Sequence, residues 1–478
     1  MDSKRTWIIA GIFILAIGMC LCGLLIFLIS RSGWIIRQFG SVMPTDTTLP
    51  TSTQTAIPLP DPTTEATPFI PFTETPPPTE TTGLDLEILE QMDEIEVQVM
   101  DLRGLWTTGP VPRSLLTKDE LRQRVMEDFL ADYTEVEAQD DVRVLALLGL
   151  LEPEFDLLGF YLELYSEQVA GYYDDEAKEM FVVQDEGFKG PERLTYAHEF
   201  THVLQDQIYD FQEGLNYTDE FCEAESERCA ALQAVIEGDA TYLEEQWLRN
   251  YATPKDIMEI LDFVGSYSSP VYDSAPDFMQ EDFLFPYTYG TDFVREIHFE
   301  GGWAAVDALY ANPPVSTEQI LHPDRFPGDL PILLEAPDLE ASLGGDWREI
   351  EHNVLGEWYT RLTLDEYVEY DLAVQAAEGW GGDYYVALYN DENNQGAFVL
   401  MTVWDRVKDA EEFYLTFEDY GENRFGSGSI STLSSTWASS EGHVLIERWG
   451  NQTLWILAPG AQELENLRGA IEFPPPGS

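Results

Sequence analysis

The sequence predicts an α+β protein: a mainly helical body that carries a small sheet, followed by a small C-terminal α+β module. Stretches between residues 84 and 248 space apolar side chains as helices do, while "VAGYYDDEAKEMFVV" at 169–183 places two β-rich runs around a turn. After residue 381, strand-like and helix-like runs alternate. With 478 residues, of which 44% are hydrophobic, the chain can bury more than one core.

The chain is strongly acidic, with 88 Asp and Glu residues against 25 Lys and Arg and a net charge of -63. A field of this sign repels the phosphates of nucleic acids and the headgroups of anionic lipids. We therefore expect no nucleic-acid partner.

The N-terminus is expected to anchor the chain in a membrane. After a tip of residues 1–6, the run 7–29 (WIIAGIFILAIGMCLCGLLIFLI) contains no charge, and about 20 apolar residues suffice to cross a bilayer. A cleaved signal peptide is the alternative, but the run exceeds the usual apolar core and lacks a clear small-x-small cleavage site. Basic residues flank both ends of the run, so their count does not decide its orientation.

Residues 30–83 are expected to form a stalk, because the segment 44–83 is dominated by Thr and Pro and has few large apolar side chains. The stalk would hold a folded body off the membrane surface. That body contains only two cysteines, Cys222 and Cys229, and an isolated pair in an exported chain favours a disulfide over a reduced or metal-binding pair. We therefore expect a single-pass protein of the cell membrane, with its C-terminal part outside the cytoplasm.

The body is expected to span residues 84–380 and to begin with a helical layer at 84–170. Thr117 and Glu120 in "TKDE" have the spacing of a capping box and predict a helix start there. The segment 169–183 then forms a strand-turn-strand unit that leads to the motif "LTYAHEFTHVLQDQ" at 194–207.

This motif predicts a metal site on a helix. Pro191 suits a first helical residue, and the helix is expected to run to about Tyr209. His198 and His202 are four residues apart, so both imidazoles leave the same face and can meet one ion, while Glu199 lies about 100° round the helix, beside the open position of the metal. The histidines could instead be ordinary core or surface residues, although about one chance match of this kind is expected in a hundred such chains.

A catalytic zinc needs three protein ligands and an exchangeable water, so a third ligand is expected downstream. Glu237, followed by the small Gly238, lies in a second predicted helix at 230–248. Other acids lie nearer in the sequence, at 220–227, and they flank or lie between the two cysteines. On a continuous helix these cysteines would be about 10 Å apart, too far for a disulfide, so a bridged segment is expected to be a loop. A loop holds a metal ligand less rigidly than a helix does. The alternative is that Glu237 is an ordinary solvated acid.

The partners of the metal-bound histidines can also be predicted. Such rings usually donate their second nitrogen to a carboxylate or carbonyl. Asp239, close to Glu237, and Asp206, one turn past His202, are the candidates, unless both are plain surface acids.

The pair "HEFTH" and a downstream helix carrying "EGDA" resembles the gluzincin clan of zinc metallopeptidases over about 167–246. The resemblance implies a zincin-like catalytic domain in which His198, His202 and Glu237 bind Zn2+ and Glu199 is the base. It also implies that the strand before the motif helix, within 171–183, is the sheet edge that binds extended peptide. A Tyr or His from a later helix assists the transition state in related peptidases, which makes Tyr289 and His322 candidates.

The C-terminal module, 381–478, is expected to have a ββα-ββα arrangement. Its tryptophans, Trp404, Trp449 and Trp455, are expected in the core, and it shows no ligand cluster.

The function predicted from these elements is a membrane-anchored, extracytoplasmic zinc peptidase acting on peptide or protein substrates. One alternative is a catalytically weak zinc-containing ectodomain that serves as a cell-surface binding module. Another is a structural or adhesive ectodomain without metal. Metal analysis separates the last from the other two, and chelator-sensitive proteolysis separates the first two.

Overall fold

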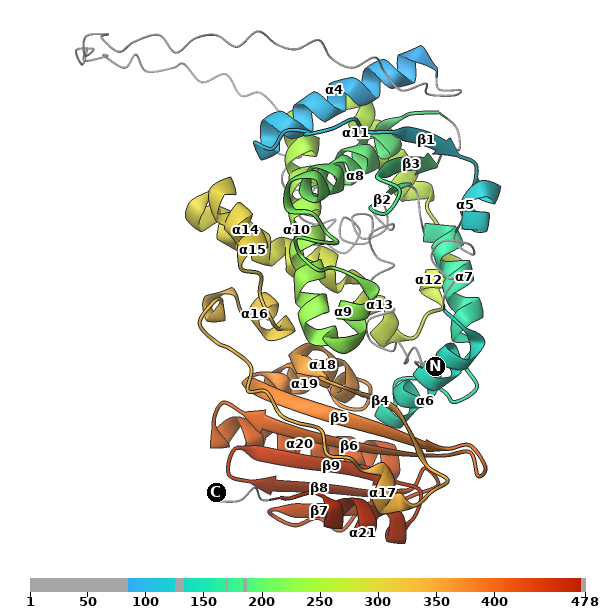
Figure 1. Cartoon of the computed structure of the whole chain (residues 1–478), viewed down its shortest axis with the longest axis vertical. Coiled ribbons are helices and arrows are strands. Elements are labelled where there is room, and N and C mark those ends of the chain that lie inside the picture. The colour runs from blue at the N-terminus through green and yellow to red at the C-terminus, as the bar shows by residue number, and fades with distance from the viewer. Residues whose placement is uncertain (1–84, 125–132, 169–170, 184–186, 474–478) are drawn as a thin grey trace, which may run out of the picture.

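The structure is a computed structural model and describes residues 85–124, 133–168, 171–183 and 187–473. The described chain is α+β, with a helical body in the upper half of Figure 1 and a six-stranded sheet in the lower half. The expected membrane span 7–29 and stalk 30–83 lie outside the described residues. Within the described ranges, no helix is both long and apolar enough to cross a membrane.

The body opens with helices that are capped by local sequence. Asp85 accepts a hydrogen bond from the N–H of Glu87 at the start of the first helix, and the capping box predicted at Thr117 and Glu120 is present. One strand, β1, interrupts the predicted helical layer because it pairs in parallel with a strand far along the chain. The elements are α4 Leu86–Arg103, β1 Arg113–Leu116, α5 Lys118–Arg124, α6 Glu135–Leu148 and α7 Leu157–Gln168.

The predicted strand-turn-strand unit is an antiparallel hairpin of β2 (Gly171–Asp174) and β3 (Glu179–Val183). Its turn is held by the Asp174 carboxylate, which accepts a hydrogen bond of 2.7 Å from the N–H of Ala177. The order β1-β3-β2 makes β2 an edge strand in the part of the chain that the structure describes. The strand directly before the motif helix, β3, is therefore central, and the edge is the strand before it.

The motif helix α8 spans Gly190–Tyr209, which agrees with the prediction to within one residue. It packs against α4 and against the long helix α10, Ser226–Asn250. The short helix α9, Asp219–Ala224, precedes α10. Apolar side chains of α4, the hairpin, α8 and α10 form one core cluster, which includes the apolar residues of the motif itself.

The elements of the rest of the body are α11 Pro254–Ser266, α12 Pro270–Asp273, α13 Asp277–Phe285, the π-helix η3 Pro286–Gly290, α14 Thr291–Gly301, α15 Trp303–Ala311, α16 Thr317–Leu321 and the 3-10 helix η4 Pro323–Arg325. The π-helix η3 and helices α14 and α16 pack against α10, while α11 packs against α8 and α12 against α7. Two glycines allow the backbones of α10 and η3 to approach each other closely. A Cβ on Gly238 of α10 would lie 2.3 Å from the backbone of Gly290 of η3, and a Cβ on Gly290 would lie 2.1 Å from the carbonyl oxygen of Ala234.

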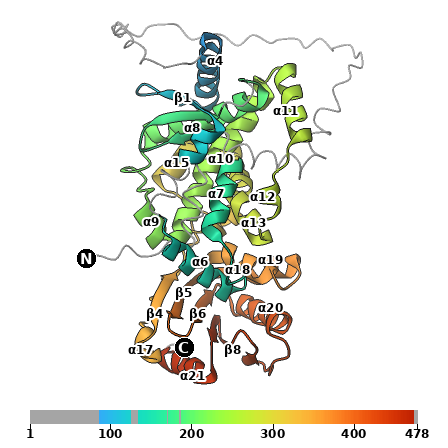
Figure 2. The same ribbon diagram turned by 90° about the vertical axis from the view of Figure 1, so that its right-hand side faces the viewer.

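The C-terminal part is a six-stranded antiparallel sheet in the order β4-β5-β6-β9-β8-β7. In Figures 1 and 2, α18 and α19 lie between this sheet and the helical body. The elements are α17 Glu340–Leu343, β4 Arg348–Asn353, α18 Gly356–Asp365, α19 Tyr370–Ala377, β5 Trp380–Asn390, β6 Gln395–Trp404, α20 Val407–Phe425, β7 Ser434–Ala438, β8 His443–Trp449, β9 Gln452–Ala458 and α21 Ala461–Ala470.

The predicted ββα-ββα pattern is present as β5-β6-α20 and β8-β9-α21, but β4 and β7 extend the sheet at its two edges. Because β4 belongs to this sheet, the sheet begins before the predicted boundary at 381. Alternate residues of the central strands pack against α20 on one face and α21 on the other, so both faces are buried. Trp404 and Trp455 are in the core as predicted, whereas Trp449 is 44% exposed.

Candidate metal centre

Three side chains converge between α8 and α10. The Nε2 atoms of His198 and His202 are 3.0 Å apart, and the Oε2 of Glu237 lies 3.2 Å from the first and 3.4 Å from the second. A tetrahedral zinc ion with bonds of about 2.0–2.1 Å holds adjacent ligand atoms about 3.3–3.4 Å apart. The three atoms therefore fit one zinc ion.

Local helix geometry and one close helix contact explain this convergence. His198 and His202 lie one turn apart on α8, so their rings leave the same face. Glu237 comes from the facing stretch of α10, just before Gly238, where α10 meets the backbone of η3. All three side chains are buried, which fixes them in one arrangement.

The second nitrogen of each ring has its own partner. The Nδ1 of His198 lies 3.2 Å from the Oε2 of Glu244, and the Nδ1 of His202 lies 2.8 Å from the Oε1 of Gln205. Both acceptors hold a proton on Nδ1 and leave the Nε2 lone pair for a metal. Glu244 lies two turns past Glu237 on α10, so a search for acids at helical spacing from the third ligand could have found it.

The predicted partners, Asp239 and Asp206, have other roles, and within the described chain neither contacts a ring nitrogen of the motif. Asp239 pairs with Arg103 and reaches His202 only through Gln205. Asp206 accepts hydrogen bonds from the hydroxyl of Tyr173 and the N–H of Phe211, and it pairs with Lys178. Asp239 is two residues past Glu237 and therefore faces another side of α10. Asp206 is one turn past His202 on α8, but its carboxylate is taken up by these three partners.

The electrostatics of the centre favour a cation. Burial works to lower the pKa of His198, but Glu237 and Glu244 outweigh it and raise that pKa to about 10. Burial likewise works to raise the pKa of Glu237, but the two histidines outweigh it and lower that pKa. Buried carboxylates thus surround the imidazoles, and a divalent cation would balance their charge.

Glu199 stands beside this triangle and outside it. Its Oε2 accepts a hydrogen bond of 3.0 Å from the N–H of Tyr173 on the edge strand β2. Its Oε1 is buried and has no hydrogen-bond partner among the described residues. Burial raises the pKa of Glu199 to about 7, against the lowering effect of the two histidines. A carboxyl with this pKa can take up and release a proton near neutrality.

Two tyrosines lie near the centre. The ring of Tyr287 is 6.4 Å from that of His198, centroid to centroid. The hydroxyl of Tyr217 is buried without a hydrogen-bond partner in the described ranges, and burial raises its pKa, with the charge of Glu237 as the next contribution. A phenol hydroxyl can donate to negative charge, which makes both tyrosines candidates for a donor at the centre.

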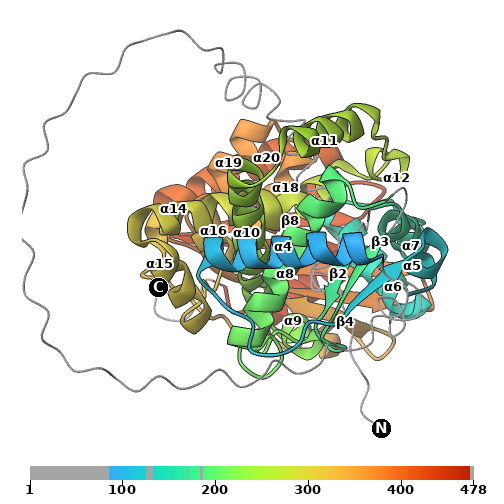
Figure 3. The ribbon, with the colours of Figure 1, turned by 90° about the horizontal axis from the view of Figure 1, so that it is seen from above.

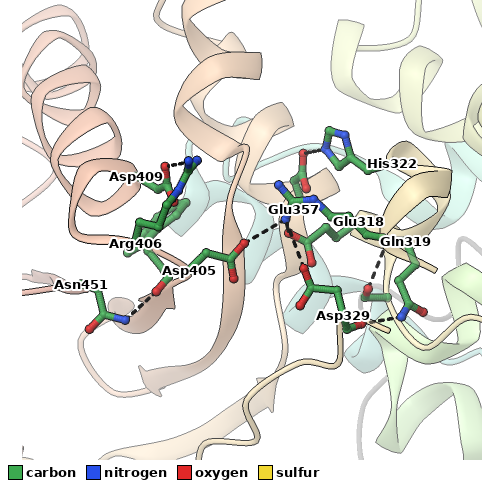
Figure 4. Close-up of polar contacts among 12 residues, drawn as sticks. Glu318, Gln319, His322, Asp329, Glu357, Asp405, Arg406, Asp409 and Asn451 are labelled. Carbon is green, nitrogen blue, oxygen red and sulfur yellow. Dashed lines mark hydrogen bonds and ion pairs between the residues drawn. The ribbon is translucent and has the colours of Figure 1, made fainter. Parts of the chain in front are cut away.

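The predicted donors, Tyr289 and His322, are placed elsewhere. The ring of Tyr289 packs on Phe285 and Trp358. The Nε2 of His322 lies 2.8 Å from the Oε1 of Glu357. Figure 4 shows this pair beside a group of acidic residues, Glu318, Asp329 and Asp405, where the helical body meets the six-stranded sheet. Tyr289 is two residues past Tyr287 in η3, so it faces the opposite side of the helix. The sequence does not reveal which of the two tyrosines faces the metal centre.

That acidic group is the second set of possible ligands within the described residues. The carboxylates of Glu318, Asp329 and Asp405 converge in Figure 4. The Nη1 of Arg325 pairs with Glu318, lies 3.0 Å from Asp405 and 3.7 Å from Asp329. The guanidinium already supplies the positive charge, and the network ties η4 to the turn after β6.

The predicted disulfide between Cys222 and Cys229 is present, with the Cα atoms 5.0 Å apart. The expected loop is instead a pair of helices, because Glu225 has a non-helical backbone and separates α9 from α10. This break brings together two cysteines that a continuous helix would separate.

Comparison with known protein families finds a match in the C-terminal part of the chain. A family model described as a domain of unknown function (DUF8575) matches residues 344–468. The match covers the six-stranded sheet. It runs from just before β4 into α21 and does not include His198, His202 or Glu237. No curated protein and no solved structure matches the chain.

Proposed function

We propose that this chain is a zinc-dependent peptidase with a zincin-like catalytic domain, anchored in a membrane and acting outside the cytoplasm. The observation that carries the proposal is the triangle of His198 Nε2, His202 Nε2 and Glu237 Oε2, whose edges of 3.0, 3.2 and 3.4 Å suit one tetrahedral ion. Glu199 adds a carboxylate next to the triangle, and this combination is what hydrolysis by a metal-bound water requires.

The bound ion would lower the pKa of a water molecule and polarise the carbonyl of the scissile peptide bond. The free Oε1 of Glu199 would take the proton of that water and deliver it to the leaving amine. The hydrogen bond from Tyr173 to Oε2 holds the carboxylate in place during both transfers.

Substrate binding is proposed at the outer edge of β2. Because Tyr173 of this strand contacts Glu199 directly, an extended peptide added beside β2 would pass next to the base. Main-chain hydrogen bonds to a strand edge accept many sequences, which suits peptide or protein substrates in general. Tyr217 and Tyr287 replace Tyr289 and His322 as the proposed donors to the charge that develops on the carbonyl oxygen.

The setting of the enzyme is proposed from the sequence together with the disulfide. The run 7–29 would anchor the chain and 30–83 would act as a stalk. The Cys222–Cys229 bridge suits an oxidising compartment outside the cytoplasm. The net charge of -63 argues against a nucleic-acid partner.

The test uses the purified full-length chain. One zinc per chain is expected by metal analysis, with hydrolysis of an unstructured protein that stops when a chelator is added and returns with zinc. His202→Ala should abolish both. Zinc without hydrolysis would point to the binding module, and a chain without zinc would point to the structural ectodomain.

A further inference from the structure

A buried chain of hydrogen bonds runs from His202 to the first described helix. We infer that Gln205 and Arg103 are positioning residues that hold His202 in the tautomer able to bind the metal. This inference rests on the proposed metal centre. It names residues outside the ligand triangle that the centre depends on, one of them at the end of α4.

Gln205 sets the tautomer through the orientation of its amide. Its Nε2 donates to the carbonyl oxygen of Ile236 at 3.0 Å and to the Oδ2 of Asp239 at 3.2 Å. Both partners accept only, so the nitrogen must face them and the oxygen must face His202. An amide oxygen can only accept, so the Nδ1 of His202, 2.8 Å away, carries the proton. The Nε2 of His202 then has its lone pair free for the metal.

Asp239 keeps this amide in place, and Arg103 keeps the Asp239 carboxylate in place. The Nε of Arg103 lies 2.9 Å from Oδ1 of Asp239, and its Nη2 lies 3.1 Å from Oδ2. Both side chains are fully buried, and a buried carboxylate without such a partner would be strongly disfavoured. Tyr310 donates to the same carboxylate at 2.7 Å. The paired carboxylate is therefore a fixed acceptor for Gln205.

The relay joins parts of the chain that are distant in sequence. Arg103 is the last residue of α4, which lies across α8 and α10 as Figure 3 shows. Its Nη1 also pairs with Asp307 at 2.7 Å, and its guanidinium lies 4.6 Å from the ring of Trp303. His198 uses a separate support, the carboxylate of Glu244, so loss of the relay disturbs one histidine and leaves the other oriented.

The test compares full-length variants by their zinc affinity, measured in competition with a chelator. Arg103→Met and Gln205→Leu should each weaken zinc binding about 10–100-fold, as changes behind a metal ligand do. The double variant should lose little more than the worse single variant, because both act through one chain of contacts. With Co2+ in place of zinc, the visible absorption bands should shift in each variant, since they report the geometry of the ligands.

Arg113→Met is the matched control. Arg113 pairs with Asp93 at 2.8 Å and Glu96 at 3.1 Å, so it also fastens α4, but it does not lead to the metal. This variant should keep the zinc affinity and cobalt spectrum of the wild type. An equal loss in Arg113→Met would overturn the inference, because the docking of α4 alone would then explain the effect.

Other outcomes are equally decisive. If Arg103→Met does not fold, Arg103→Lys keeps the charge and loses the two-pronged contact, and it should show an intermediate affinity. Wild-type affinity in a folded Arg103 variant, or in Gln205→Leu, would overturn the inference while the metal centre stands. A wild-type chain that binds no zinc would overturn the proposed function and the inference together.

Discussion

Replacing Glu199 by Gln separates the proposed chemistry from the architecture of the site. Glutamine keeps the size of the side chain, and its carbonyl oxygen can still accept the 3.0 Å hydrogen bond from Tyr173. Glu199 is outside the ligand triangle, so zinc content and the melting temperature should not change. What is lost is the acceptor at Oε1, which has no partner among the described residues and would take the proton of the water.

The expected loss is therefore catalytic alone. General acid-base catalysis by one positioned group is worth about 10²–10⁴-fold in rate, or about 2.7–5.4 kcal/mol of the activation barrier. The assay is the initial rate of cleavage of an unstructured protein, with zinc measured in the same sample. Glu237→Gln is the paired variant, and it should lose zinc as well as activity, because an amide is a poor ligand for this cation.

Two results would refute the reasoning. If Glu199→Gln loses zinc, Glu199 is a ligand and the triangle has been misassigned. If it cleaves at the wild-type rate with zinc retained, the residue is not the base. A split between the two variants, with metal retained at one position and lost at the other, is the outcome that the geometry requires.

Three further predictions concern the supports of the site and of the fold. Glu244→Gln should weaken zinc binding about 10–100-fold by chelator competition, since it loosens a ligand ring, and an unchanged affinity would contradict that role. Reduction of the Cys222–Cys229 disulfide should add the mass of two hydrogens. In denaturant titration it should lower the free energy of unfolding by about 2–3 kcal/mol, as expected for so short a loop. Free thiols in the native protein would show that the disulfide is absent. Burial raises the pKa of Asp282 to about 6, although Tyr359 and Trp358 donate to it. The folded state then holds this proton more tightly than the unfolded one, so the stability it contributes is present below pH 4 and is lost as the pH rises through 6. Asp282→Asn should remove that part of the slope of melting temperature against pH, and an identical slope in the variant would show that the carboxyl titrates normally.

The sequence alone determined those features of the site that depend on local spacing. His198 and His202 share a face because a helix repeats every 3.6 residues, and Pro191 marks where that helix begins. Glu237 could be chosen because a small residue follows it, and Gly238 does meet a backbone closely, that of Gly290. The disulfide followed from there being one pair of cysteines in the folded part.

The tertiary structure decided what depends on the rotation and pairing of distant elements. The strands β1 and β4 are short, and they form only because β3 and β5 offer them hydrogen bonds from elsewhere in the chain. Several acids of similar spacing surround the motif, and only the packing of α8 against α10 brings Glu244 to the ring of His198. The same packing orients the amide of Gln205, which is already near His202 on α8. In the same way the turn of η3 against α10 places Tyr287 near His198. Spacing along a helix is a local property that the sequence carries, whereas the face that meets a neighbour is set when two helices pack, and side chains from the whole chain determine that contact.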